Sequence, residues 1–126
     1  KAGLMRLILP ATAKPLNVGQ SYSWTLSVYC DPAKPSSSVF VNGTIQRVAP
    51  VASLQRRNKT SPMEQVNLYA ANGIWYDALD SLAVLYRANP RDRSVVSAWT
   101  SLLQQVNLDS LAKTSFSECC TAQPSR

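Results

Sequence analysis

The sequence contains no histidine, and this absence excludes more chemistry than any other feature of its composition. Without an imidazole there can be no Ser-His-Asp or Cys-His catalytic arrangement. Three cysteines without histidine also fall short of the roughly four ligands that a closed zinc site needs. We therefore predict no catalytic residues, no bound metal, no cofactor and no enzymatic activity.

Long hydrophobic runs are missing as well. Arg6 interrupts the apolar run near the start of the chain, and no segment approaches the roughly eighteen apolar residues of a membrane-spanning helix. Charged residues make up only 16% of the chain, and 13 basic residues outnumber 7 acidic ones. We predict no membrane span, a neutral-polar surface that is typical of many extracytoplasmic proteins, and a weak preference for anionic surfaces.

The three cysteines are Cys30, Cys119 and Cys120, and no two of them form a Cys-x-x-Cys pair. An odd number suits an oxidising compartment, where one bridge forms and the remaining thiol pairs with a segment outside this chain. We predict a bridge from Cys30 to Cys119 or Cys120. The alternative is three free thiols in a cytosolic protein.

Residues 1–50 carry a period-two pattern that predicts β-strands. In YSWTLSVYC alternate side chains are apolar, which indicates a half-buried strand. The face predicted to be buried comprises Tyr22, Trp24, Leu26, Val28 and Cys30. The segment DPAKPSSS then breaks the strand, and SVFVNGTIQRV resumes strand structure.

Two further features of this part concern its turns and its completeness. Asn42-Gly43 fits either a tight hairpin turn or a glycine bulge within one long strand, and we favour the bulge because each arm of a hairpin would be very short. GLMRLILP is predicted as a third strand that ends at Pro10. Three strands are few for a stable sheet, so the β-rich part is predicted to be incomplete.

Residues 61–112 are predicted to be helical. Ser61-Pro62-Met63-Glu64 is a capping box with proline at the first helical position. We predict helices to about residue 72, over 75–88 and over 94–105, with Gly73 as a turn, Asn89-Pro90 as a stop and Asn107 as a left-handed cap. The predicted core positions are Ala78, Leu79, Leu82, Leu85, Tyr86, Val95, Trp99, Leu102, Leu103 and Val106, together with Trp24 and Trp75. Residues 113–126 form a cysteine-bearing tail.

The first two predicted helices follow the pattern of a tetratricopeptide repeat. The matching positions are Tyr69, Gly73, Trp75, Ala78, Leu82 and Pro90. Pro62, however, stands where the pattern has its first Trp, and a solenoid needs about three repeats to bury a continuous core. We therefore predict one tetratricopeptide-like hairpin that packs on the sheet and on the third helix, rather than a peptide-binding groove.

Charged clusters offer three candidate sites, each with a simpler explanation. Asp77 and Asp80 could act as paired carboxylates, but surface acids at a helix start are favoured. The run of residues 56–59, RRNK, could contact phosphates but lacks the aromatic residues that stack on bases, so we predict no nucleic-acid binding. Arg87, Arg91 and Arg93 could form a contact patch for anions, although ordinary helix-end cations are favoured.

Five segments together resemble a known family. YSWTLSVYCDP, SVFVNGTIQRV, LYAANGIWYDALDSLAVL, AWTSLLQQVNLDSLA and the terminal ECC are similar in order and spacing to the cyanobacterial family called domain of unknown function 928. The resemblance implies an exported protein, with a signal peptide and a β-rich segment ahead of this region, and it implies no activity. Asn42 and Thr44 flank Gly43 where the family is expected to have an acidic residue and an aromatic one, which makes them interaction candidates beside the arginines.

The combined prediction is a single α+β domain over residues 1–126. An antiparallel β-meander or partial β-sandwich precedes a helical hairpin and a third helix, and an N-terminal β segment is lacking. The predicted function is a non-enzymatic, periplasmic or extracellular interaction or assembly module. Uncharged strand edges such as SYSWTLSV would pair with a protein partner or a second copy. The alternative is a periplasmic binding module for a small or anionic ligand.

Overall fold

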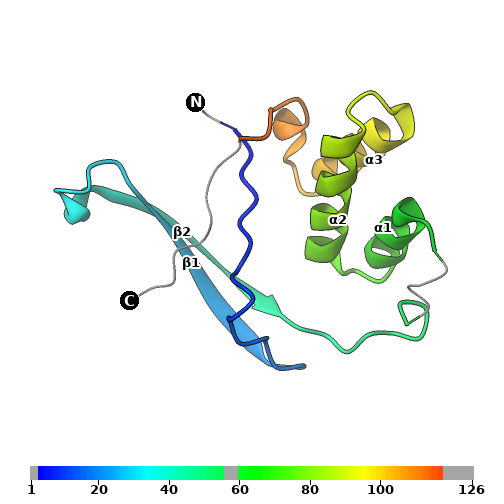
Figure 1. Cartoon of the computed structure of the whole chain (residues 1–126), viewed down its shortest axis with the longest axis horizontal. Helices are drawn as coiled ribbons and strands as arrows, with labels where there is room; N and C mark the ends of the chain where they lie inside the picture. Colours follow the sequence, from blue (N-terminus) through cyan, green and yellow to red (C-terminus); the bar gives the residue numbers. More distant parts are fainter. Residues whose placement is uncertain (1–2, 56–59, 118–126) are drawn as a thin grey trace. The chain divides into compact units, whose positions relative to one another are not determined.

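The computed structural model describes residues 3–55 and 60–117 (Figure 1). Two strands precede three α-helices, so the predicted α+β class is confirmed. The elements are β1 (Ser21–Tyr29), the 3-10 helix η1 (Pro35–Ser37), β2 (Ser38–Gln46), α1 (Pro62–Ala71), α2 (Trp75–Ala88), α3 (Arg93–Gln104) and the 3-10 helix η3 (Asp109–Leu111). The chain divides into a hairpin unit, Thr12–Pro50, and a helical unit formed by the residues before and after it.

The hairpin unit is a two-stranded antiparallel sheet. Its register runs without a break from Ser21 opposite Gln46 to Tyr29 opposite Ser38. Because directly opposite residues point to the same face of a sheet, the period-two pattern makes one face apolar and the other largely polar. The apolar hairpin face comprises the pairs Tyr22 and Ile45, Trp24 and Gly43, Leu26 and Val41, and Val28 and Val39.

The predicted bulge at Gly43 is wrong, although the prediction of one long strand there is right. Gly43 pairs in regular register with Trp24, and the chain reverses between Cys30 and Ser38 instead. A Cβ on Gly43 would lie 2.7 Å from the ring carbon Cζ2 of Trp24. The glycine therefore leaves room for the indole to lie across β2.

The predicted third strand is also wrong. Within residues 3–10, only Leu4 forms a β-bridge, in parallel with Phe116. The Leu4 N–H donates to the Ser115 carbonyl at 2.9 Å, and the Ser117 N–H donates to the Leu4 carbonyl at 2.8 Å. Beyond Leu4 the segment is held by the side chain of Arg6, which contacts α2, so it is extended without being part of a backbone ladder.

Local signals fix the helix ends. The Ser61 hydroxyl accepts from the Glu64 N–H at 3.3 Å, and the Glu64 carboxylate accepts from the Ser61 N–H at 2.7 Å, which confirms the capping box. Gly73 has φ +71° and Asn107 φ 59°, as turns and left-handed caps require. Asp92, which was not predicted as a cap, caps α3: its carboxylate accepts from the Ser94 N–H at 2.8 Å.

The buried core lies in the helical unit, where α1 packs on α2 and α2 packs on α3. Its members are Leu54, Val66, Tyr69, Ala78, Leu82, Ala83, Val95, Trp99, Leu102, Leu103 and Ala112. Trp99 is 3% exposed, as predicted for a core residue, and Trp75 is half-buried. Trp24 is 39% exposed, so its assignment to the core is wrong. No helix in the described part of the chain is long and apolar enough to cross a membrane.

Candidate functional site

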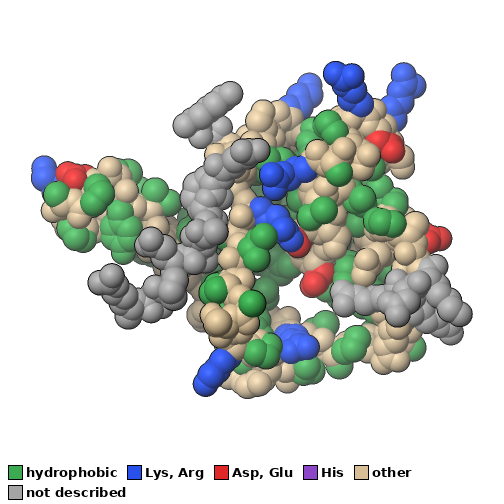
Figure 2. All heavy atoms as spheres, viewed as in Figure 1, with side chains coloured by type: hydrophobic (Ala, Val, Ile, Leu, Met, Phe, Trp, Pro, Cys, Tyr) green, Lys and Arg blue, Asp and Glu red, His purple; other side chains and the backbone are tan. Residues whose placement is uncertain are grey.

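The apolar hairpin face is exposed. None of the residues 12–50 is buried, and Val39 of this face is 64% exposed. Figure 2 shows hydrophobic side chains spread over the visible part of the hairpin, with charged side chains at its turn. The alternation predicted a half-buried strand, but within the described residues no element of the hairpin unit covers the apolar face. The prediction of an apolar face is therefore right, and the prediction that this face is buried is wrong.

The edges of the hairpin are also available for pairing. Each strand has one neighbour in the two-stranded sheet, so each keeps one edge without a ladder partner among the residues that the structure describes. Neither Ser21–Tyr29 nor Ser38–Gln46 contains a charged residue or a proline. Natural sheets commonly use such residues to block edge pairing, and these strands lack them.

The interaction candidates Asn42 and Thr44 lie on the opposite, polar face of the hairpin. They pair with Thr25 and Ser23 respectively, and both are exposed. The structure therefore places them away from the apolar side chains. A partner that used both features would have to wrap around the edge of β2.

Cys30 follows β1 directly and is exposed. The prediction that it faces a core is wrong, because its side chain is exposed. Cys119 and Cys120 lie outside the described residues, as does the basic run at 56–59. The bridge from Cys30 to one of them stays a prediction.

The carboxylates of α2 do not form a pair. The Arg6 guanidinium donates to both carboxylate oxygens of Asp80, with the Nη2–Oδ2 bond at 2.8 Å. These bonds hold the pKa of Asp80 below its ordinary value, although partial burial acts in the opposite direction. Asp80 is therefore an ion-pair partner, in agreement with the preference for surface acids over an acid–base pair. Across residues 3–55 and 60–117, no three potential metal-binding side chains come together.

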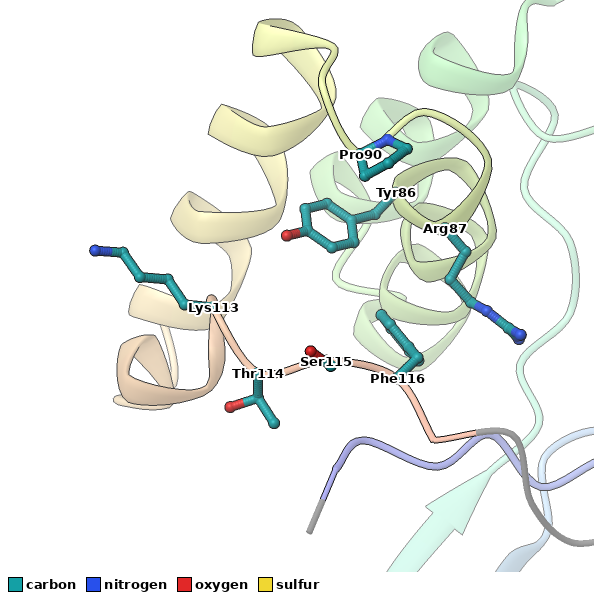
Figure 3. A pocket seen from close by; sticks show the side chains of 7 residues that line it. All are labelled: Tyr86, Arg87, Pro90, Lys113, Thr114, Ser115 and Phe116. Atoms are coloured by element: carbon teal, nitrogen blue, oxygen red, sulfur yellow. The ribbon is translucent and has the colours of Figure 1, made fainter. Parts of the chain in front are cut away.

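The helical unit contains a hollow of about 420 Å³ between the end of α2 and the loop after η3 (Figure 3). Its lining residues are Tyr86, Arg87, Pro90, Lys113, Thr114, Ser115 and Phe116. Of the three arginines predicted to cluster here, only Arg87 lines the hollow. Arg91 is exposed on the turn between α2 and α3, and Arg93 is exposed at the first position of α3.

An aromatic cluster forms the back of this hollow. The Tyr86 ring stacks on Trp99 with centroids 5.5 Å apart, and Phe116 tilts against Trp99 at 5.8 Å. The Arg87 guanidinium carbon lies 5.5 Å from the centroid of Phe116. The sequence analysis missed the hollow because its two sides lie far apart in the chain. One signal was present: Phe116 is the sole aromatic residue of the tail 113–126.

A β-hairpin followed by a helical hairpin and a third helix defines a small α+β protein whose exposed features are a strand pair and a basic, aromatic hollow. The chain belongs to the family Domain of Unknown Function (DUF928), which matches residues 1–116. No curated protein and no solved structure matches the chain.

Proposed function

We propose that the chain is a non-enzymatic, exported assembly module, periplasmic or extracellular, whose hairpin pairs with a β-strand of a second copy. The observation that supports this proposal is the exposed apolar hairpin face together with strand edges that carry no charge and no proline. The cyanobacterial origin and the export rest on the family resemblance and the polar composition.

The physical argument begins with the hairpin itself. An isolated two-stranded sheet is marginally stable in water, because it buries little apolar area. Each strand also leaves the backbone N–H and C=O groups of its outer edge to solvent. An added strand would satisfy the free N–H and C=O groups of one edge and cover alternate apolar side chains. Since the strands carry no charge, like-charge repulsion within the strands does not oppose pairing between two copies.

The test is the mass of the full chain by light scattering over a concentration series. Wild-type mass should rise with concentration to at least that of a dimer. Leu26→Lys places a charge on the apolar hairpin face and should keep the chain monomeric at concentrations about tenfold higher. Thr25→Lys is the matched control, because its neighbouring position in β1 points to the polar face; it should still assemble.

Two outcomes would contradict the proposal. A wild-type monomer at every concentration would rule out self-assembly, and a strand from the preceding β-rich segment that the family resemblance implies would then be the partner to add. Equal effects of the two lysine variants would show that the apolar hairpin face is not the interface. Circular dichroism of each variant checks that the fold is retained.

The non-enzymatic part of the proposal is supported by the lack of histidine in the sequence and by the engagement of Asp80 with Arg6. A panel of ester, phosphate and peptide substrates should show no turnover above that of the buffer. Turnover that is lost in Asp77→Asn or Asp80→Asn would contradict it, because it would give those carboxylates a catalytic role.

A further inference from the structure

The hollow of the helical unit carries positive charge that no acidic residue neutralises. Arg87 and Lys113 line it, and none of the lining residues is acidic. Among the residues that the structure describes, the only ion pair joins Arg6 and Asp80, so neither Arg87 nor Lys113 has a carboxylate partner there. The Arg87 guanidinium contacts the ring of Phe116 instead.

Arg87 is also not needed to cap α2. The Asn89 side chain donates to the Leu85 carbonyl at 3.3 Å, and the Asn89 N–H donates to the same oxygen at 2.9 Å. A cation near the end of a helix is favoured by the helix dipole, and this is the simplest explanation of Arg87. That explanation predicts an effect on stability but none on binding, so the two can be separated by experiment.

Ser115 adds a hydroxyl group to the same hollow, whereas the Thr114 side chain extends from the other side of the loop in Figure 3. Thr114 and Ser115 line the hollow, and their hydroxyls have no hydrogen-bond partner within the described residues. Figure 3 shows the Ser115 hydroxyl pointing from the loop toward Tyr86. The loop is fixed at its backbone, because the Thr114 N–H donates to the Leu111 carbonyl at 2.9 Å and the Ser115 carbonyl accepts from Leu4 at 2.9 Å. The backbone that carries the Ser115 hydroxyl is thus held in place before any ligand arrives.

Three ring-bearing residues form the apolar part of the walls, beside the polar and charged lining residues. Tyr86, Phe116 and Pro90 present ring surfaces to it, and Tyr86 is backed by the buried Trp99. The hollow is open to solvent, and its volume of about 420 Å³ is at the low end of the range of roughly 300–1,000 Å³ that is typical of small-molecule sites. A flat ring could lie against these walls.

We propose that this hollow binds a small organic anion with a flat apolar body, of the aromatic carboxylate class. The ring would lie against Tyr86 and Pro90, and the carboxylate would accept a hydrogen bond from the Ser115 hydroxyl. The exposed Arg87 side chain, which extends past Phe116 and away from Ser115 in Figure 3, would turn back to pair with the carboxylate. Arginine suits this role because its planar fork matches the two oxygens of a carboxylate. This site is separate from the hairpin, and the proposal does not depend on the assembly function.

The test is a titration of the full isotope-labelled chain with sodium benzoate, followed by nuclear magnetic resonance. The amide signals of Ser115 and Phe116 should shift saturably. Arg87→Gln should weaken binding by about tenfold, because one charge-assisted pair is lost. Arg91→Gln is the matched control: it removes the same charge from an exposed arginine of the neighbouring turn and should leave the affinity unchanged.

Benzamide and inorganic phosphate complete the experiment. Benzamide keeps the ring without the charge, and phosphate keeps the charge without the ring; each should bind at least about tenfold more weakly than benzoate. Equal binding of either probe, an equal loss in Arg87→Gln and Arg91→Gln, or no saturable shift at Ser115 and Phe116 would overturn the proposal. Arg87→Lys, which keeps the charge, should lose less affinity than Arg87→Gln, and unchanged melting temperatures would exclude an effect on folding.

Discussion

At the scale of single residues, the glycine at position 43 makes room for the indole of Trp24, and the indole covers the glycine. They lie directly opposite on the hairpin, and a Cβ on Gly43 would lie 2.7 Å from Cζ2 and 2.8 Å from Cε2 of the indole. A side chain at position 43 would therefore displace Trp24. The indole in turn covers a stretch of backbone that a glycine leaves open, an arrangement known to stabilise glycines in sheets.

We predict that Gly43→Val destabilises the hairpin by about 1–3 kcal/mol through overpacking, even though valine favours strands. The same change in a Trp24→Ala background should be neutral or stabilising, because the clash is gone. Urea unfolding monitored through amide signals of β1 and β2 measures both effects. An equal loss of stability in the two backgrounds would mean that the cost of Gly43→Val does not arise from a clash with Trp24.

Asp80 gives a prediction for pH dependence. The hydrogen bonds from Arg6 lower its pKa in the folded chain, so the ion pair contributes stability above the unfolded pKa of about 3.9 and loses it as the pH falls through the lower folded value. The contribution is small, at most about 1 kcal/mol, since solvent reaches both side chains, which are 31% exposed in Arg6 and 52% in Asp80.

The titration of the Asp80 carboxyl carbon should thus have its midpoint below about 3.9, and in Arg6→Gln this midpoint should move up. The signals of residues 3–10 should change over the same acidic range as the segment leaves α2. A midpoint at or above that of an unstructured aspartate in the wild-type chain would contradict the ion pair.

At the scale of elements, Ala78 sets how closely α2 can approach its neighbours. Its side chain is 0% exposed, and the buried Leu82 follows one turn later on the same helix. We predict that Ala78→Leu lowers the free energy of unfolding by about 1–3 kcal/mol, because the core has no room for three more carbons. Val84→Leu, at a position of the same helix that is 45% exposed, should change it by less than about 0.5 kcal/mol. Denaturation followed by circular dichroism compares them, and similar losses would show that α2 is not tightly packed.

The helices could be predicted from the sequence because their ends are encoded locally. The predicted range of α2, 75–88, agrees with Trp75–Ala88. The predicted range of α3, 94–105, is one residue later than Arg93–Gln104, because the cap at Asp92 was not predicted. The core positions predicted from apolar periodicity in residues 75–106 are buried or half-buried, apart from Val106, which is 40% exposed, whereas Val66, Tyr69 and Ala83 of the core were not predicted. In each case the deciding contacts lie within one or two turns of the residue.

In the β-rich part, the sequence predicted correctly only the two long strands and the alternation of their apolar and polar side chains. Alternation identified the apolar hairpin face, but burial of Trp24 and Cys30 depends on a covering layer, which alternation cannot reveal. Gly43 was misread as a bulge because its reason is a side chain 19 positions away in sequence, at Trp24. The hollow joins residues 86–90 to 113–116 through an aromatic cluster, so no local pattern could predict it.

At the scale of the whole molecule, burial is divided unevenly between the two units. All buried hydrophobic residues of the described chain belong to the helical unit, and none lies within residues 12–50. Local stability follows buried apolar contacts. The helical unit should therefore be stable on its own contacts, whereas the hairpin should open readily until a partner covers it.

Amide hydrogen exchange turns this contrast into a prediction. At a concentration where the chain is monomeric, amides of β1 and β2 should exchange at least about a hundredfold faster than those of α3, because opening the hairpin exposes little apolar surface.

In an antiparallel pair, alternate amides of each strand point outward from the ladder. If a second copy pairs with an edge, the outward amides of one strand should become protected on assembly. If two apolar faces stack without edge pairing, only the inward, already paired amides should slow. The amides of α3 serve as the internal control and should not change. Hairpin amides as well protected as those of α3 in the monomer would show that the chain itself covers the hairpin, and would leave no vacant edge for an assembly partner.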